Sequence, residues 1–173
     1  MANLGADALK TTLTNPARPY LWEVLVSAPK GGGSQTDLYF RCQSASAPGR
    51  GFNVINIPYK GSAGVNFAGK ETYPQKETLT FVEGTDKKII TAIYGWMQYI
   101  RDNASGVGKP DSSYKTDMYV NLLAQDDSIF AKYKIMGAWP SDMPDTALQY
   151  GQEGTSPLII TVTFTYDRWE LVD

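Results

Sequence analysis

Hydrophobic and polar residues alternate most regularly near the end of the chain, in the segment LIITVTFTYDRW at residues 158–169. Alternation with a period of two predicts a β-strand with one face in a core and the other in water. At about 3.3 Å per residue, twelve residues make a strand about 40 Å long. The predicted inward residues are Leu158, Ile160, Val162, Phe164 and Tyr166, and the outward ones are Ile159, Thr161, Thr163, Thr165 and Asp167.

Other segments with strand-like patterns predict a mainly β chain. The segment KIMGAWP at residues 134–140 reads as the end of a strand that stops at Trp139-Pro140. The first two predicted strands, residues 18–27 and 37–44, flank a glycine-rich loop at residues 29–36. This order suggests a hairpin with a long connection. Besides the closing strand, strands are expected at residues 18–27, 37–44, 75–82, 114–124 and 129–139.

One segment, residues 86–103, has the periodicity of an amphipathic helix. Thr85 is a candidate N-cap, and the carboxylate of Asp86 suits the positive end of the helix dipole. Arg101 suits the opposite end. The apolar face of this predicted helix consists of Ile89, Ile93, Trp96, Met97 and Ile100.

Residues 45–74 differ from the rest because they contain three prolines and five glycines among short strand-like pieces at 52–59 and 65–68. Such a segment is a long excursion rather than core sheet, and long excursions in compact domains are usually functional or disordered. Residues 1–17 read as an N-terminal arm with a helix over residues 6–13. The remaining pattern predicts one domain, residues 1–173, with an antiparallel β-sandwich or barrel of about seven strands and one packed α-helix.

Composition narrows the possible functions. The net charge is −2, so the chain has no overall basic field to hold a polyanion. The single cysteine, Cys42, excludes an internal disulfide framework, fits a reducing compartment and reads as a small buried hydrophobe. No apolar run is long enough to span a membrane, and the start of the chain lacks a signal-peptide pattern.

The residue types needed for common catalytic sites are missing or poorly placed. The chain contains no histidine, which excludes Ser-His-Asp and Cys-His arrangements. The paired acids Asp126-Asp127 and Asp142/Asp145 lie in turn-like sequence, where aspartate is favoured for local reasons. Neither glycine cluster fits a phosphate-binding loop. We therefore expect no catalytic, cofactor-binding or metal-binding residues, and a core role for the tryptophans at positions 22, 96, 139 and 169.

The strand faces predicted to be exposed to solvent carry small neutral residues, such as Thr161, Thr163 and Thr165. Exposed strand edges are normally protected by charged residues instead. This composition suggests a hypothesis, that copies of the chain close their edges against one another. The same residues resemble a known family, the tail-tube proteins of contractile-tailed bacteriophages. The resemblance runs from about residue 17 to residue 170. It rests on the colinear segments ARPYLWEV, LYFRCQSASAP, the strand at residues 76–82, KIMGAWP and VTFTYDRWE. The loops at residues 29–36 and 103–114 look long for the family, which affects the outer surface or the contact with a sheath.

This resemblance implies a structural subunit and no enzyme. Six copies would form a ring with a continuous inner β-barrel, and rings would stack into a hollow tube inside a contractile sheath. The implied partners are the chain itself, sheath, baseplate and tail terminator proteins, and DNA that passes without specific binding. The implied location is the virion tail, after assembly in the cytoplasm of the host bacterium, with no membrane contact and no cofactor.

Two sets of residues are candidates for these roles. Thr161, Thr163 and Thr165 are expected to face the lumen. The arm and residues 45–74 are expected to carry contacts between rings, through Arg18, Arg50, Phe52, Tyr59, Lys60 and Phe67. Two alternatives remain open: the inner tube of a bacteriocin, type VI or extracellular contractile injection system, and a monomeric ligand-binding β-barrel with an enclosed apolar cavity.

Overall fold

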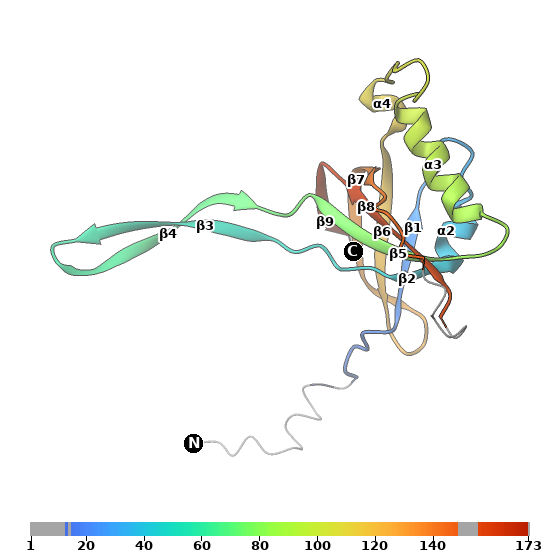
Figure 1. Ribbon diagram of the computed structural model, residues 1–173. Coiled ribbons are helices and arrows are strands. Elements are labelled where there is room, and N and C mark those ends of the chain that lie inside the picture. The colour runs from blue at the N-terminus through green and yellow to red at the C-terminus, as the bar shows by residue number, and fades with distance from the viewer. Residues whose placement is uncertain (1–12, 14, 149–155, 173) are drawn as a thin grey trace.

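The computed structural model describes residue 13, residues 15–148 and residues 156–172, so the helix expected at residues 6–13 lies, except for residue 13, outside the described part. The body contains two antiparallel sheets that share one long strand, β7 (Figure 1). Sheet A has the order β1-β6-β7-β9, and sheet B has the order β7-β8-β5-β2. The bounds of these strands are β1 Trp22–Val26, β2 Cys42–Ser44, β5 Lys76–Glu83, β6 Thr116–Leu123, β7 Ile129–Asp142, β8 Leu158–Thr165 and β9 Arg168–Val172.

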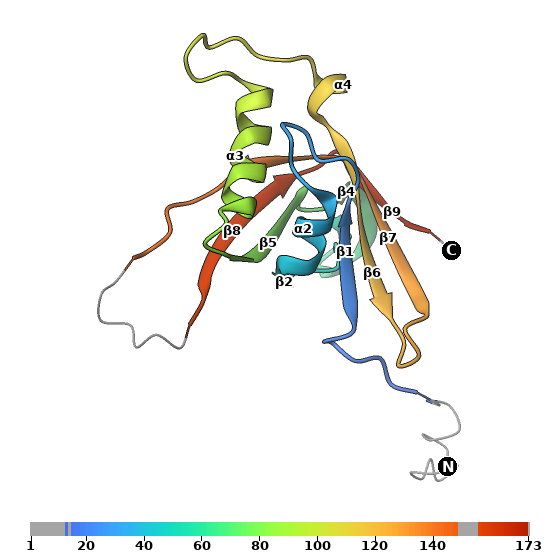
Figure 2. The same ribbon diagram turned by 90° about the vertical axis from the view of Figure 1, so that its right-hand side faces the viewer.

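The two sheets and a helix enclose one hydrophobic core. The helix α3 (Lys88–Ile100) buries Ile89, Ile93 and Trp96 completely. Together with α2 (Gln35–Arg41) it lies on the side of the body away from the projecting hairpin of β3 (Gly51–Tyr59) and β4 (Ser62–Thr72) (Figures 1 and 2). The mainly β, antiparallel architecture is therefore confirmed. The expectation of one packed helix is incomplete, because α2 also packs on this core through Leu38. The strand residues in this core are Val24, Val26, Leu79, Phe81, Met118, Val120, Ile135, Ala138, Ile160, Val162 and Phe164.

Strand β7 passes from one sheet to the other at Gly137, whose φ of +69° is unusual for any other residue. A side chain there would collide with Asp167, since an added Cβ would lie 2.2 Å from its Oδ2. The expected stop at Trp139-Pro140 is wrong, because β7 continues to Asp142 alongside β8. Pro140 is tolerated because this part of β7 is the last strand of sheet B among the described residues.

The long closing strand predicted for residues 158–169 is in fact two strands. The alternation is right for most of β8, where Ile160, Val162 and Phe164 are buried, but Leu158 at its start was expected inward and is exposed. At Tyr166 and Asp167 the chain leaves sheet B and enters sheet A, where β9 pairs with β7. The Tyr166 backbone N–H donates to the Gln75 carbonyl oxygen at 3.0 Å, which fixes this crossing. The alternation of apolar and polar residues continues from β8 through Tyr166 and Asp167, so the sequence pattern does not indicate the change of sheet.

The strand predicted at residues 37–44 is wrong over most of its length, because residues 35–41 form helix α2. The Ser34 hydroxyl oxygen accepts the Asp37 N–H at 3.3 Å, an N-cap interaction. Asp37 and Arg41 are one helical turn apart and approach to 4.0 Å. The predicted hairpin between the first two strands is therefore also wrong, and β1 pairs with β6 instead.

Helix α3 begins differently from the prediction, because Thr85 does not cap it. Lys87 is the N-cap residue, in a left-handed conformation and without a side-chain cap. The buried carboxylate of Glu83, at the end of β5, instead accepts the backbone N–H groups of Ile89 at 3.3 Å and Ile90 at 2.6 Å. Glu83 of strand β5 thus accepts hydrogen bonds from two backbone N–H groups in the first turn of α3, which have no acceptor within the helix.

We expect the substitution Glu83→Ala to lower the free energy of unfolding by roughly 1–3 kcal/mol, because it leaves buried N–H donors without an acceptor. Glu83→Gln keeps one oxygen acceptor and should cost less. Urea denaturation followed by circular dichroism measures both changes. Equal losses for the two variants would show that these hydrogen bonds do not hold the helix start.

The remaining strands, β3 (Gly51–Tyr59) and β4 (Ser62–Thr72), form a separate two-stranded sheet. This β3–β4 hairpin projects from the body as a long arm (Figure 1). The segment expected to be an excursion, residues 45–74, therefore contains regular strands longer than the short pieces that the sequence pattern indicates. A short helix, α4 (Asp111–Tyr114), follows the loop after α3.

Candidate assembly surfaces

The β3–β4 hairpin exposes an apolar face to solvent. The strand register places Ile55 opposite Phe67 and Ile57 opposite Val65, so all four side chains share one face. They are 52%, 53%, 53% and 55% exposed, respectively. On the other face the Asn56 side-chain N–H donates to Asn66 Oδ1 at 2.7 Å. Val54 is on the same face as Asn56 and is 69% exposed, so apolar side chains occur on both faces. Four of them cluster on the first face, which we call the apolar face, and such a cluster is typical of a contact surface for another protein.

The base of the hairpin is fixed to the body by polar contacts. Within the hairpin, Arg50 joins the two strands at their base, because it forms an ion pair with Glu71 at 2.7 Å and lies over the ring of Phe52, 5.3 Å from its centroid. Two hydrogen bonds connect this base to the body. The indole N–H of Trp169 donates to the Gly49 carbonyl oxygen at 3.2 Å. The Gln75 side-chain N–H donates to the Asp167 carbonyl oxygen at 3.0 Å. Hydrogen bonds at both ends of the hairpin, at Gly49 and at Gln75, therefore fix the direction in which it leaves the body.

A buried polar cluster lies behind the base of the hairpin. The Glu77 carboxylate is 3% exposed and accepts the backbone N–H of Ser46 at 2.6 Å. Burial raises the pKa of Glu77, and it also raises the pKa of the Cys42 thiol to about 12. Cys42 therefore stays protonated at neutral pH and behaves as a small packed side chain.

The outer face of sheet B is covered with hydroxyl groups. Thr78 and Thr163 lie opposite one another with their hydroxyl oxygens 3.3 Å apart, and Thr165 donates to the Ser141 hydroxyl at 2.7 Å. We call this surface the hydroxyl face. Charged side chains occur at its margins, at Lys76 and Asp142, and the register also places Val82, Ile159 and Trp139 on it. Its members are Ser44, Thr78, Thr80, Ser141, Thr161, Thr163 and Thr165.

The outer face of sheet A is different because it carries charges. Lys134 forms an ion pair with Asp117 at 3.3 Å. The Glu23 carboxylate accepts hydrogen bonds from Asn121 at 2.7 Å and from the hydroxyl of Tyr39 at 2.9 Å. The outer face of sheet B is therefore largely neutral and the outer face of sheet A is charged, so the two faces differ in the partners that they can contact.

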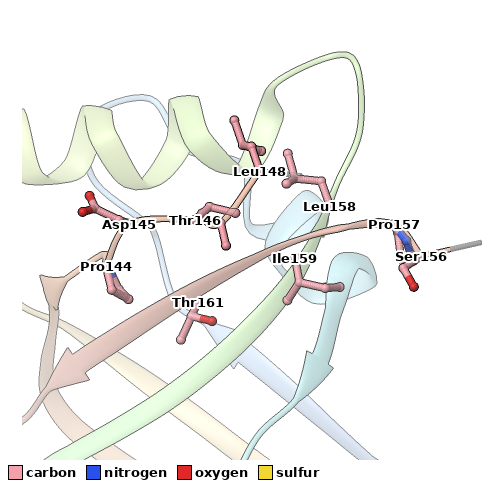
Figure 3. A pocket seen from close by; sticks show the side chains of 10 residues that line it. Pro144, Asp145, Thr146, Leu148, Ser156, Pro157, Leu158, Ile159 and Thr161 are labelled. Carbon is pink, nitrogen blue, oxygen red and sulfur yellow. The ribbon is translucent and has the colours of Figure 1, made fainter. Parts of the chain in front are cut away.

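Sheet B has two open edges within the described residues. On one side β2 is the last strand of the sheet. On the other, β7 pairs only with Thr163–Thr165 of β8, and a groove of about 480 Å³ lies beside the first half of β8 (Figure 3). Ile159 and Thr161 of β8 border this groove, opposite Pro144 and Thr146 of the connection after β7. Open edges expose N–H and C=O groups that can pair with another chain.

The structure brings together five of the six residues predicted to contact a neighbouring ring. Arg50, Phe52, Tyr59, Lys60 and Phe67 lie on the hairpin, from its base to its tip. Arg18 lies apart from them, beside a groove of about 280 Å³ that Phe130 also lines.

Sequence reasoning missed three apolar residues of the hairpin face: Ile55, Ile57 and Val65. The segment FNVINIPYK contained a usable signal, because apolar residues occur there on both faces of one strand. Prolines and glycines around this segment obscured the pattern.

The other candidate features have structural explanations. Asp126 accepts the N–H and the hydroxyl of Ser128, which is a local turn interaction. Gly31 packs so closely on helix α3 that an added Cβ would lie 2.1 Å from the Gly95 carbonyl oxygen, so this position of the glycine-rich loop requires glycine for packing. Within the described ranges, no acidic or cysteine cluster is arranged to hold a metal ion, and no helix is long and apolar enough to cross a membrane.

Comparison with known proteins gives the chain its family. A model of the phage tail tube protein family matches residues 12–172. The tail tube protein of Serratia phage KSP90 is 24% identical over 131 residues, which cover 73% of this chain and 72% of the relative.

Solved structures share the fold. One is a chain of the sheath–tube complex of an extracellular contractile injection system, PVC, in its extended state; the TM-score is 0.65 at 14% identity, over 97% of this chain and 99% of that one. A type six secretion system protein gives a TM-score of 0.53 at 15% identity, over 87% of this chain and 82% of that one. Because the family model spans almost the whole sequence, the resemblance is confirmed, and the chain belongs to the phage tail tube protein family.

Proposed function

We propose that six copies of this chain form a ring and that rings stack into a hollow tube through which phage DNA passes. In this proposal the tube lies inside a contractile sheath, contacts baseplate and terminator proteins at its ends, and belongs to the virion tail after assembly in the host cytoplasm. The structurally similar PVC chain comes from a sheath–tube complex, which supports a sheath as the outer partner.

The apolar face of the hairpin is the observation that carries this proposal. Four neighbouring apolar side chains, each about half exposed on a projecting arm, are costly in a lone soluble subunit. A second copy that covers this face removes the cost. The hairpin then forms the contact between rings, together with the predicted residues Arg50, Phe52, Tyr59 and Lys60, and with Arg18 of the N-terminal segment.

The hydroxyl face suits the wall of a conduit for DNA. Protein grips DNA mainly through lysine and arginine contacts to phosphate, and this face offers chiefly serine and threonine hydroxyls. Thr161, Thr163 and Thr165 then face the lumen from the middle of sheet B. In this arrangement the charged outer face of sheet A does not line the lumen.

The open edges of sheet B suit a closed ring. A subunit with an open edge on each side of one sheet can pair head to tail with its neighbours, and a closed barrel leaves no exposed edge. Strand β2 at one edge and the first half of β8 at the other are the candidate partners. The β8 groove provides the space for an incoming strand.

A tube that serves a different contractile machine is the second candidate. The TM-score of 0.65 with the PVC chain favours it as far as the fold is concerned. Both candidates require the same rings and tubes and differ in what the lumen conducts. The family assignment argues against the monomeric ligand-binding barrel.

Negative-stain electron microscopy of the purified protein tests the proposal. We expect rings with a central hole, and tubes of stacked rings at higher protein concentration. A preparation that contains compact single particles at every concentration would overturn the proposal.

A further inference from the structure

Strand β5 buries two glutamates, Glu77 and Glu83, in different surroundings. Glu83 lies 3.5 Å from the guanidinium of Arg41 and accepts hydrogen bonds at the start of α3. Glu77 is 3% exposed and accepts the backbone N–H of Ser46 at 2.6 Å. Among the described residues, no lysine or arginine forms an ion pair with Glu77. A buried carboxylate without a cation destabilises the folded state, so stability alone does not explain Glu77.

The side chains around Glu77 supply no positive charge. Phe164 lies opposite it on β8, Cys42 approaches from β2, and Tyr166, with Tyr73 close by, approaches from the segment after β8. Burial raises the pKa of the Cys42 thiol, and burial followed by the charge of Glu77 raises the pKa of Tyr166. Burial also raises the pKa of Glu77, which hydrogen bonds from Ser46 only partly offset. Glu77 is therefore the group of this cluster that gains a proton as the pH falls below neutral.

A second hydrogen-bonding partner is available to the protonated form of Glu77. The Tyr166 side chain is 1% exposed, and its hydroxyl has no hydrogen-bond partner among the described residues. A carboxylate only accepts hydrogen bonds, whereas a carboxylic acid also donates one, and the Tyr166 hydroxyl oxygen can accept it. The ionised form of Glu77 therefore favours the Ser46 N–H, and the protonated form gains a reason to turn toward Tyr166.

Ser46 lies at a mechanically important place in the chain. It belongs to residues 45–50, which lead from β2 into the hairpin and which we call the root segment. The root segment has a second attachment to the body, the hydrogen bond from the Trp169 indole to the Gly49 carbonyl oxygen at 3.2 Å. An indole does not titrate, so of these two attachments only the one through Glu77 depends on pH.

The other end of the hairpin, at Gln75, is held without a titrating partner. Gln75 has a left-handed backbone with a φ of +51°. Its carbonyl oxygen accepts the Tyr166 N–H at 3.0 Å, and its side chain donates to the Asp167 carbonyl oxygen at 3.0 Å. The Asp167 carboxylate forms an ion pair with Lys115 at 2.9 Å. The contacts of Gln75 thus consist of amide and backbone groups, which keep their charge at all ordinary pH values.

We propose that Glu77 is a proton-sensitive latch on the root segment: its carboxylate holds Ser46 at neutral pH, and its protonated form releases Ser46. A hydrogen bond to a charged acceptor is stronger than one to a neutral acceptor, which gives the buried charge a purpose. Acidification then leaves the hairpin attached at Gly49 and at Gln75 but less firmly held at Ser46. The latch is a property of the subunit and does not depend on the function proposed above.

Hydrogen–deuterium exchange of the full-length protein, followed by mass spectrometry, tests the latch. Peptides that cover residues 45–50 report on the root segment, and peptides of α3 serve as an internal reference. At about pH 8 we expect the root segment of Glu77→Gln to exchange several-fold faster than that of the wild type. At about pH 4.5, the usual pKa of glutamate, wild-type Glu77 is mostly protonated and the difference should disappear. The same difference at both pH values, or none at either, would overturn the proposal.

Trp169→Phe is the matched control, because it removes the indole N–H that holds Gly49 and introduces no titrating group. It should speed exchange of the root segment at both pH values. If Glu77→Gln does not fold, the wild type decides. The protection of its root segment, relative to an unstructured peptide at the same pH, should then fall several-fold between about pH 8 and about pH 4.5, while that of α3 stays the same. Constant protection of the root segment would overturn the proposal.

Urea denaturation at several pH values tests whether the charge is kept at a cost in stability. The folded state raises the pKa of Glu77 above the usual value of 4.5, so the cost is absent below that pH and is complete above the folded-state pKa. We expect Glu77→Gln to have a higher urea midpoint than the wild type at about pH 8, with an advantage that shrinks toward about pH 4.5. A lower midpoint for the variant at about pH 8 would show that the carboxylate serves stability, which contradicts the proposal.

Discussion

Removal of the outer hairpin is expected to give a folded subunit that no longer stacks. The variant replaces residues 53–70 with Asn-Gly, a dipeptide that connects adjacent antiparallel strands in a tight turn. Phe52 and Glu71 are opposite one another in the register, so a two-residue turn can join them, and the variant keeps both partners of the Arg50–Glu71 ion pair. The buried core lies outside the removed segment, so stability should change little.

Sedimentation and electron microscopy measure the fraction of protein in tubes. We expect this fraction to fall at least tenfold when the hairpin is removed. A second variant separates hairpin length from hairpin chemistry: it keeps the whole arm but changes Ile55, Ile57, Val65 and Phe67 to threonine. Threonine retains strand propensity and removes the apolar face, so this variant should also fail to stack. Tubes of normal length from either variant would refute the role of the hairpin.

Trp96→Ala is expected to destabilise the subunit by about 3–5 kcal/mol, the usual cost of truncating a buried aromatic side chain. Trp96 is fully buried, its indole N–H donates to the Tyr114 carbonyl oxygen at 2.9 Å, and its ring meets Phe164 of sheet B at 6.0 Å between centroids. The residue therefore connects α3, the segment before β6, and β8. With a urea m-value of about 2 kcal/mol/M, the midpoint should fall by about 1.5–2.5 M.

The hairpin-truncated subunit is the best host for this measurement, because stacking would otherwise add to the apparent stability. Tyr94→Ala is the matched control on the same helix, since Tyr94 is 52% exposed. It should change the free energy of unfolding by less than about 0.5 kcal/mol. Similar losses for the two variants would show that Trp96 does not organise the core.

Local sequence patterns predicted the parts of the fold that depend on neighbouring residues. Period-two alternation identified β8 correctly, with Ile160, Val162 and Phe164 inward. Helical periodicity placed the buried face of α3 correctly at Ile89, Ile93 and Trp96. These patterns reflect burial on one side of an element, which the chain encodes locally.

The errors occurred where contacts distant in sequence decide the structure. Alternation could not reveal that the chain changes sheets after Thr165, because the crossing depends on the hydrogen bond to Gln75 and on the partner strand β7. The cap of α3 was missed because Glu83 belongs to the preceding strand. Helix α2 was read as a strand because aromatic residues such as Tyr39 and Phe40 are common in strands. Local capping by Ser34 overrides that tendency.

The candidate surfaces were predictable only in part. The sequence pointed to the threonines of β8 and to the hairpin segment as a whole. It did not reveal that Ile55, Ile57, Val65 and Phe67 share one face, because that depends on the register between β3 and β4.

Helical reconstruction of the purified assembly by electron cryomicroscopy would show which face of the subunit lines the lumen. We expect a hollow tube of stacked rings, with Thr161, Thr163 and Thr165 on the lumen wall and the β3–β4 hairpins between adjoining rings. A reconstruction with the charged face of sheet A on the lumen, or with hairpins that contact no neighbouring ring, would contradict the proposed function.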